Sequence, residues 1–203
     1  VDIHRWDETA AIAELVRRYV AGYGPVTLSD ISWWTGFTKA RCSAALDAMG
    51  KDIVEVAVDG WSGPLFLHCD ADLSVISDGC INVLPLLDPY VQGYRDRDRL
   101  LDDDLHHFVW DGGGNSTATV AHRGRIVGVW QAVPKPAAVR YHLFQPIDRA
   151  LLRRVEEELD DAGHLYFDEH VDVVPVAKME PLTGPTGARS AMHPLDDVLH
   201  RAK

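Results

Sequence analysis

The sequence contains no uninterrupted run of about 18 apolar residues, the length that a membrane-spanning helix needs. Its N-terminus also lacks the basic, then apolar, then small-residue order of a secretory signal peptide. Cysteine is scarce, and Cys42, Cys69 and Cys80 have no C-x-x-C spacing, so neither a disulfide framework nor a zinc site is predicted. We therefore expect a cytoplasmic protein with reduced cysteines and no membrane partner.

The signatures of common catalytic and cofactor sites are missing as well. There is no G-x-S-x-G, H-E-x-x-H, Walker or dinucleotide-binding pattern. Gly112–Gly114 precede no Lys-Ser or Lys-Thr pair, which favours a plain turn over a phosphate loop. His106 with His107, and His164 with His170, match no known metal-ligand spacing, which favours surface histidines. No cofactor, metal or catalytic residue is predicted.

Positive charge is in deficit. The formal net charge is −11, whereas nucleic-acid-binding modules usually present a basic surface to phosphate. The deficit is uneven, because residues 1–75 carry 6 basic and 11 acidic side chains and residues 147–203 carry 7 and 12. Residues 76–146 carry 7 basic and 8 acidic side chains, so this middle part is the best candidate for phosphate contact.

What the sequence does contain is a regular hydrophobic pattern at its start. In residues 7–68 the apolar positions and caps predict three helices and a hairpin. The first helix is capped by Asp7 and stopped by Gly24-Pro25, and the second runs from Thr27 to Gly36. The third is capped by Thr38 and ends at Gly50, and the strands of the hairpin are 53–58 and 64–68. This order is that of a winged helix-turn-helix, which makes DNA the first candidate partner.

The third helix presents few side chains that could read a base sequence. With Cys42, Ala45, Leu46 and Met49 facing the core, its outward positions are Ala40, Ala44, Asp47 and Lys51, flanked by Ser43 and Ala48. Base readout needs Arg, Lys, Asn or Gln, so this alanine face is also consistent with packing against another domain or with a scaffold. Lys39 and Arg41, at the start of the helix, are its candidates for DNA contact.

The middle of the chain supplies the other candidates. Tyr90 and Tyr94 precede an alternating run in which Arg95, Arg97 and Arg99 are separated by Asp96 and Asp98. These arginines, like Arg123 and Arg125 further along the chain, could bind phosphate or could pair with the nearby carboxylates, Asp102–Asp104 included. Arg123 and Arg125, at the tip of a predicted hairpin, have the stronger claim because no acid lies within several residues in sequence. The tyrosines could stack on DNA or pack under the loop.

The remaining pattern is rich in strands, and the fold class predicted is α+β. We expect a winged helix-turn-helix in residues 1–75, a β-rich, barrel-like domain in residues 76–178 and a loosely ordered tail in residues 179–203. In the second domain the predicted elements are a strand at 81–87, a hairpin of 116–121 and 126–133, a strand at 139–144, a helix ending near Gly163, and final strands at 164–167 and 171–176.

Four segments together resemble a known family. They are RRYVAGYGPVTLSDISWWTGF at 17–37, ARCSAALDAMG at 40–50, LLDPYVQGYRDR at 86–97 and GRIVGVW at 124–130. In this order they resemble the winged helix DNA-binding domain family that includes AlkZ-type DNA glycosylases. The resemblance implies tandem winged helices followed by a β-rich, barrel-like domain, and excision of alkylated or crosslinked bases. This chain would be the later winged helix and the C-terminal domain.

The chain departs from the family at the catalytic motif. The family's glycosylases carry Gln-x-Gln or Gln-x-Asp near the N-terminus, whereas Gln92, Gln131 and Gln145 are followed by Gly-Tyr, Ala-Val and Pro-Ile. Either the active site lies N-terminal to this chain, or the chain is a non-catalytic relative. Because the sequence begins with Val1 rather than Met, the first explanation is favoured.

The sequence thus predicts the DNA-binding portion of an AlkZ-like DNA-repair protein. We expect weak, sequence-independent binding to double-stranded DNA, and an N-terminal winged-helix portion of the same protein as a second partner. Glycosylase activity is expected only in combination with such a portion. The alternative is a transcriptional regulator or a protein-interaction module, which the bare third helix and the net charge of −11 favour.

Overall fold

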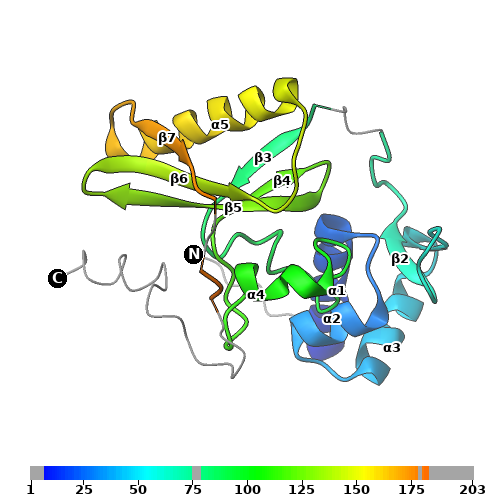
Figure 1. Cartoon of the computed structure of the whole chain (residues 1–203). Coiled ribbons are helices and arrows are strands. Elements are labelled where there is room, and N and C mark those ends of the chain that lie inside the picture. Colours follow the sequence, from blue (N-terminus) through cyan, green and yellow to red (C-terminus); the bar gives the residue numbers. More distant parts are fainter. Residues whose placement is uncertain (1–6, 75–78, 178–179, 183–203) are drawn as a thin grey trace. The chain divides into compact units, whose positions relative to one another are not determined.

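The computed structural model describes residues 7–74, 79–177 and 180–182 (Figure 1). The chain forms two compact units. Unit 1 comprises Val1–Ser74 and Gly93–Asp96, and unit 2 comprises Val75–Gln92 and Arg97–Lys203. The sequence pattern suggested a boundary near residue 75 but gave no sign that residues 93–96 return to the first unit. Most of the predicted tail, residues 179 and 183–203, lies outside the described residues.

Unit 1 contains three helices followed by a two-stranded antiparallel sheet, as the sequence predicted. The elements are α1 (Glu8–Tyr23), α2 (Leu28–Thr35), α3 (Lys39–Met49), a short 3-10 turn (Gly50–Asp52), β1 (Ile53–Val56) and β2 (Leu65–His68). Val56 lies opposite Leu65, so the strands are shorter and the connection longer than predicted. Its buried apolar side chains include Val16, Val20, Ile31 and Leu65.

The helix starts are fixed by side-chain caps at the predicted positions. Asp7 accepts a hydrogen bond from the backbone N–H of Ala10 at 3.0 Å. Thr27 and Asp30 form a complete capping box at the start of α2. The hydroxyl of Thr38 accepts from the N–H of Arg41 at 3.3 Å. Because each cap satisfies donors that the first helical turn leaves unpaired, these local patterns are sufficient to place the helices.

Asp30 also joins α2 to the returning segment of unit 1. Its carboxylate is fully buried. Oδ2 accepts from the backbone N–H of Thr27 at 3.0 Å and from the Thr27 hydroxyl at 2.8 Å. Oδ1 accepts from the backbone N–H of Arg95 at 2.9 Å and of Asp96 at 3.3 Å. One buried carboxylate therefore organises a helix start and a segment about 65 positions later in the chain.

Unit 2 is built on a five-stranded sheet in the order β3-β4-β5-β6-β7. All neighbouring strands are antiparallel except β6 and β7, which are parallel. Its elements are β3 (Ile81–Leu84), a 3-10 turn (Asp103–Leu105), α4 (His106–Val109), β4 (Thr119–His122), β5 (Arg125–Pro134), β6 (Ala137–Leu143), α5 (Arg149–Phe167) and β7 (Asp172–Pro175). The predicted hairpin around Arg123-Gly124 is therefore confirmed.

The sheet is open, not barrel-like. Among the described strands, β3 pairs only with β4 and β7 only with β6, which leaves two edges. Helix α5 lies along one face of the sheet (Figure 1). Val155 and Leu159 of α5 are fully buried against Trp130, Val139 and Tyr141 of the sheet. The core of unit 2 therefore lies between α5 and this face of the sheet, not inside a closed barrel. The expected barrel-like domain is corrected to a helix packed on an open sheet.

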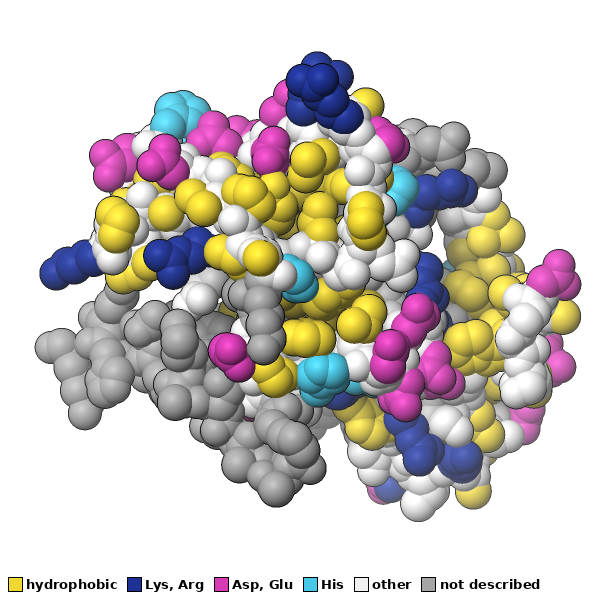
Figure 2. Space-filling model, in the orientation of Figure 1, with side chains coloured by type: hydrophobic (Ala, Val, Ile, Leu, Met, Phe, Trp, Pro, Cys, Tyr) yellow, Lys and Arg dark blue, Asp and Glu magenta, His cyan; other side chains and the backbone are white. Residues whose placement is uncertain are grey.

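The acidic run of α5 lies on its solvent side, as predicted. Glu157, Glu158 and Asp161 are exposed, and acidic side chains gather along α5 in the space-filling view (Figure 2). Tyr141 of the sheet donates its hydroxyl to Glu156 at 2.7 Å, and burial of Tyr141, together with this carboxylate, raises the pKa of the phenol.

The predicted end of this helix was wrong. We expected it to stop near Gly163 and to be followed by a strand at 164–167, but α5 continues to Phe167. It ends where Asp168 adopts a left-handed conformation, with φ of 57°. A Cβ atom at Gly163 would lie 2.8 Å from Val171 Cγ2 and 2.9 Å from Val139 Cγ2. Gly163 therefore permits close helix–sheet packing and is not a helix stop.

We expect Gly163→Ala to lower the free energy of unfolding by about 1–3 kcal/mol, because the added methyl group overpacks the helix–sheet contact. Gly22→Ala in α1 is the matched control, since nothing lies within 4 Å of a Cβ atom there. That control is expected to be neutral or to stabilise the protein by up to about 1 kcal/mol. Urea denaturation followed by circular dichroism measures both, and equal stabilisation by the two substitutions would contradict the packing explanation.

Candidate nucleic-acid interface

The residues at the tip of the β4–β5 hairpin lie at a pocket in unit 2. The pocket has a volume of about 480 Å³, within the range of small-molecule sites. Its polar lining comes from Asp102, Arg123, Arg125, His122 and Gln145. The remaining lining is apolar and includes Leu101, Ile126 and Phe144. The two arginines that the sequence favoured are thus brought to the edge of one concave surface.

The backbone of the hairpin aims these side chains. Arg123 and Gly124 have φ values of 52° and 82°, the left-handed pair that a tight two-residue hairpin turn requires. The pairing shifts between Val120 and Ala121, which lie opposite Gly128 and Ile126, so β5 contains a bulge. The bulged residue, Val127, accepts a hydrogen bond from the N–H of Phe144 at 2.9 Å, which brings the end of β6 to the pocket.

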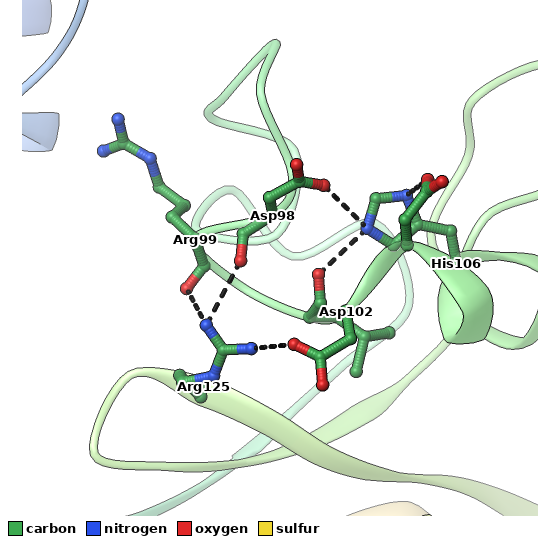
Figure 3. A network of polar contacts seen from close by, with 7 residues as sticks. Asp98, Arg99, Asp102, His106 and Arg125 are labelled. Carbon is green, nitrogen blue, oxygen red and sulfur yellow. Dashed lines mark hydrogen bonds and ion pairs between the residues drawn. The ribbon is translucent and has the colours of Figure 1, made fainter. Parts of the chain in front are cut away.

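Arg125 is held by three oxygen atoms (Figure 3). Its Nη2 donates to Asp102 Oδ1 at 2.6 Å. Its Nη1 donates to the carbonyl oxygens of Asp98 at 3.1 Å and Arg99 at 3.4 Å. Of the two alternatives for Arg125, pairing with a carboxylate is therefore confirmed: Asp102 is distant in sequence but adjacent in space.

His106 contacts three residues of the same loop, Asp98, Leu101 and Asp103. Its Nε2 lies 3.0 Å from the carbonyl oxygen of Leu101 and 3.7 Å from Asp98 Oδ1, and its Nδ1 lies 3.2 Å from Asp103 Oδ1 (Figure 3). Asp98, Asp103 and His106 place possible metal ligands within 4.8 Å of one another. However, the two carboxylates lie against different nitrogens of the ring. This arrangement suits a hydrogen-bonded imidazole and not a single ion, which binds one nitrogen of a histidine.

The family follows from comparison with known proteins. The family model "DNA glycosylase AlkZ-like" matches residues 3–165. The chain belongs to the AlkZ-like DNA glycosylase family. The solved structure of the Streptomyces sahachiroi DNA glycosylase AlkZ is similar, with a TM-score of 0.69 and 21% sequence identity over 86% of this chain. The match covers 48% of that protein, so this chain spans about half its length, and at this identity the likeness shows the fold alone. No curated protein matches the chain.

In this AlkZ-like chain, the described residues include no helix with the length and apolar character to cross a bilayer. Cys42, Cys69 and Cys80 form no disulfide, and Cys42 is buried on α3 as predicted.

Arg97 has an intramolecular role in the AlkZ-like chain. Its guanidinium carbon lies 4.5 Å from the centre of the Trp110 ring, and Nη2 donates to the carbonyl oxygen of Gly114 at 3.3 Å. Burial lowers the pKa of Arg97, an effect that the charge of Asp111 opposes. Asp111 Oδ1 in turn accepts from the N–H groups of Gly113 at 2.8 Å and Asn115 at 2.9 Å. The glycine loop is thus occupied by the chain's own carboxylate, consistent with a plain turn.

The two candidate tyrosines support the backbone. Tyr90 donates its hydroxyl to the carbonyl oxygen of Gly124 at 2.7 Å, directly under the hairpin tip. Burial raises the pKa of Tyr90 against the opposing charges of Arg99 and Arg125, so the phenol remains a donor at neutral pH. Tyr94, in unit 1, is only 6% exposed and donates to the carbonyl oxygen of Tyr23 at 3.0 Å. Both contacts favour the packing interpretation over stacking on DNA.

The candidates on α3 lie in unit 1. Lys39 and Arg41 are exposed, and Arg41 forms an ion pair with Glu8 and lies over the Phe37 ring at 5.2 Å. Arg95, also in unit 1, is exposed, and its backbone is fixed by Asp30. The outward alanines and Asp47 are exposed as predicted.

Sequence reasoning missed Asp102 and Gln145 as members of the pocket. Asp102 lies 23 positions from Arg125, and a backbone hydrogen bond of 2.8 Å from the N–H of Ile126 to the carbonyl oxygen of Leu100 brings the two segments together. Gln145 reaches the pocket only because β6 ends beside the bulge of β5. No local pattern encodes either contact, although the aspartate run after the arginines offered a possible partner.

Proposed function

We propose that this chain contacts the DNA backbone as part of an AlkZ-like DNA-repair protein, and that the β4–β5 hairpin tip is its principal contact. The observation that carries this proposal is the position of Arg123 and Arg125. Both are exposed, and they flank Gly124 at the edge of the pocket. Guanidinium groups bind phosphate through paired hydrogen bonds, so two of them at a protruding turn suit a duplex backbone.

We further propose that unit 1 acts as a winged helix-turn-helix. Its order of three helices and a hairpin supports this, and helix α3 occupies the position of a recognition helix. Its outward face offers Ala40, Ala44 and Asp47 in place of base-reading side chains, so the binding we propose is to double-stranded DNA, weak and independent of sequence.

The chemistry proposed for the complete protein is base excision. A water molecule would attack the anomeric carbon while carboxamide or carboxylate groups stabilise positive charge on the sugar. Gln145 lines the pocket but is followed by Pro146-Ile147, not by the catalytic pattern of the family's glycosylases. We therefore assign no catalytic residue in this chain and propose that these groups come from a winged-helix portion outside it.

Binding to a fluorescent random-sequence duplex at low salt tests the proposal. The double variant Arg123→Ala/Arg125→Ala is expected to bind about tenfold more weakly or worse, because hydrogen bonds to charged groups are lost. The wild-type affinity should fall as salt is added. The control is Arg149→Ala/Arg153→Ala, which removes the same charge from exposed positions of α5. Equal losses of affinity in both double variants would mean that only net charge matters. That result would contradict the assignment of the hairpin tip as the principal DNA contact.

A protein-interaction module is the second candidate. A groove of about 270 Å³ lies between α1 and α3, and its apolar lining consists of Ile12, Ala13, Ala44, Ala45 and Ala48. Small side chains allow another helix to approach closely, which favours a protein partner for this face. Absence of duplex binding even at low salt would favour this function, and preference for one sequence among many would favour a transcriptional regulator.

A further inference from the structure

Arg125 already contacts a negatively charged group in the structure, the carboxylate of Asp102, and this carboxylate is accessible to solvent. The side chains of Arg125 and Asp102 are 51% and 63% exposed, and they meet at 2.6 Å through a single pair of atoms, Nη2 and Oδ1. Exposed ion pairs are weak, because water solvates both partners well when they separate. The contact can therefore exchange with another oxyanion.

The orientation of the guanidinium does not depend on Asp102 alone. Nη1 is fixed separately by the carbonyl oxygens of Asp98 and Arg99 (Figure 3). If the Asp102 carboxylate moves away, these two contacts keep Nη2 directed toward the same point. The guanidinium is thus preorganised for whichever oxyanion replaces the carboxylate.

Arg123 is the second cation at this position. Arg123, Arg125 and Asp102 all line the same pocket at the hairpin tip. A carboxylate carries one negative charge on two oxygens, and a phosphodiester carries one negative charge on its two non-bridging oxygens. The two groups therefore make similar demands on a guanidinium, and both form short, charge-assisted hydrogen bonds with it.

We propose that this position is a binding site for one phosphodiester group of the DNA backbone, and that the Asp102 carboxylate occupies it in the free protein. The inference rests on the proposed function, since it names how the hairpin tip takes phosphate. Asp102 acts as an internal competitor: DNA binds by displacing it from Arg125. It therefore weakens binding, and it also reduces the salt dependence, because the released carboxylate again attracts a cation.

The test compares Asp102→Asn with Asp104→Asn in the duplex-binding assay. Both variants lose one negative charge from the same exposed stretch, but only Asp102 contacts Arg125. Asp102→Asn is expected to bind about three- to fivefold more tightly than Asp104→Asn. Its plot of log affinity against log salt concentration should be steeper by up to about 0.9, the contribution of one more phosphate contact. In an Arg125→Ala background the difference between the two variants should disappear.

The outcomes separate this inference from the proposed function. Equal affinities for the two variants would show that only net charge matters and would overturn the inference while leaving DNA binding intact. Weaker binding by Asp102→Asn would show that the carboxylate positions Arg125, which also overturns it. Binding by Asp102→Asn without binding by the wild type would support it in its strongest form. Absence of binding in every variant would overturn both the inference and the proposed function.

Discussion

Replacing Asp30 with alanine is expected to lower the free energy of unfolding by about 3 kcal/mol or more. The carboxylate is fully buried and accepts hydrogen bonds from Thr27, Arg95 and Asp96. Its removal leaves these donors without their acceptor inside unit 1, and a buried unsatisfied donor costs about 1–3 kcal/mol. Urea denaturation followed by tryptophan fluorescence measures the change.

Two further substitutions test whether the cost comes from the carboxylate of Asp30. Asp30→Asn keeps one acceptor oxygen but directs an NH2 group at donors, so we expect an intermediate loss of about 2 kcal/mol. Asp47→Ala, on the exposed face of α3, is the matched control and should stay within about 0.5 kcal/mol of the wild type. A cost for Asp30→Ala no larger than that of Asp47→Ala would show that residues 93–96 do not depend on this carboxylate.

Asp30 makes one contact that could be predicted from the sequence and others that could not. Its capping role was predictable because Thr27 lies three positions away and the pattern is local. Its contacts with Arg95 and Asp96 were not, because no periodicity links positions so far apart. Gly163 illustrates a different failure: glycine near an expected helix end usually signals a stop, but here it reflects the proximity of Val139.

The candidate site was predictable to the same extent. The turn at Arg123-Gly124 is a local signal, and it located the two tip arginines in the correct structural context. The judgement that they lack acidic neighbours used distance along the chain, which carries no information about Asp102 across a loop. Likewise, the run around Arg97 left phosphate contact and pairing with carboxylates open, whereas the stacking of Arg97 on Trp110 depends on how the loop folds back.

Gly128→Val is expected to cost about 3 kcal/mol or more in the free energy of unfolding, because overpacking against backbone cannot be relieved by a rotamer change. A Cβ atom at Gly128 would overlap the carbonyl oxygen of His142 and would lie 3.1 Å from Leu143 Cα, both on the neighbouring strand β6. The strands would have to separate. Thermal unfolding measures the loss, and Gly22→Val in open space on α1 serves as control, with a change expected to stay within about 0.5 kcal/mol because valine is a slightly better helix former than glycine.

The same substitution tests whether the pocket depends on the pairing of β5 and β6. Gly128 lies next to the bulged Val127, which fixes Phe144, and three positions after Arg125. At a temperature where Gly128→Val remains folded, displacement of β5 should move the tip arginines relative to the loop that holds them, and duplex binding should weaken severalfold. Undiminished binding by a folded Gly128→Val protein would mean that the hairpin tip acts on DNA independently of the pocket beneath it, as two exposed charges on a turn.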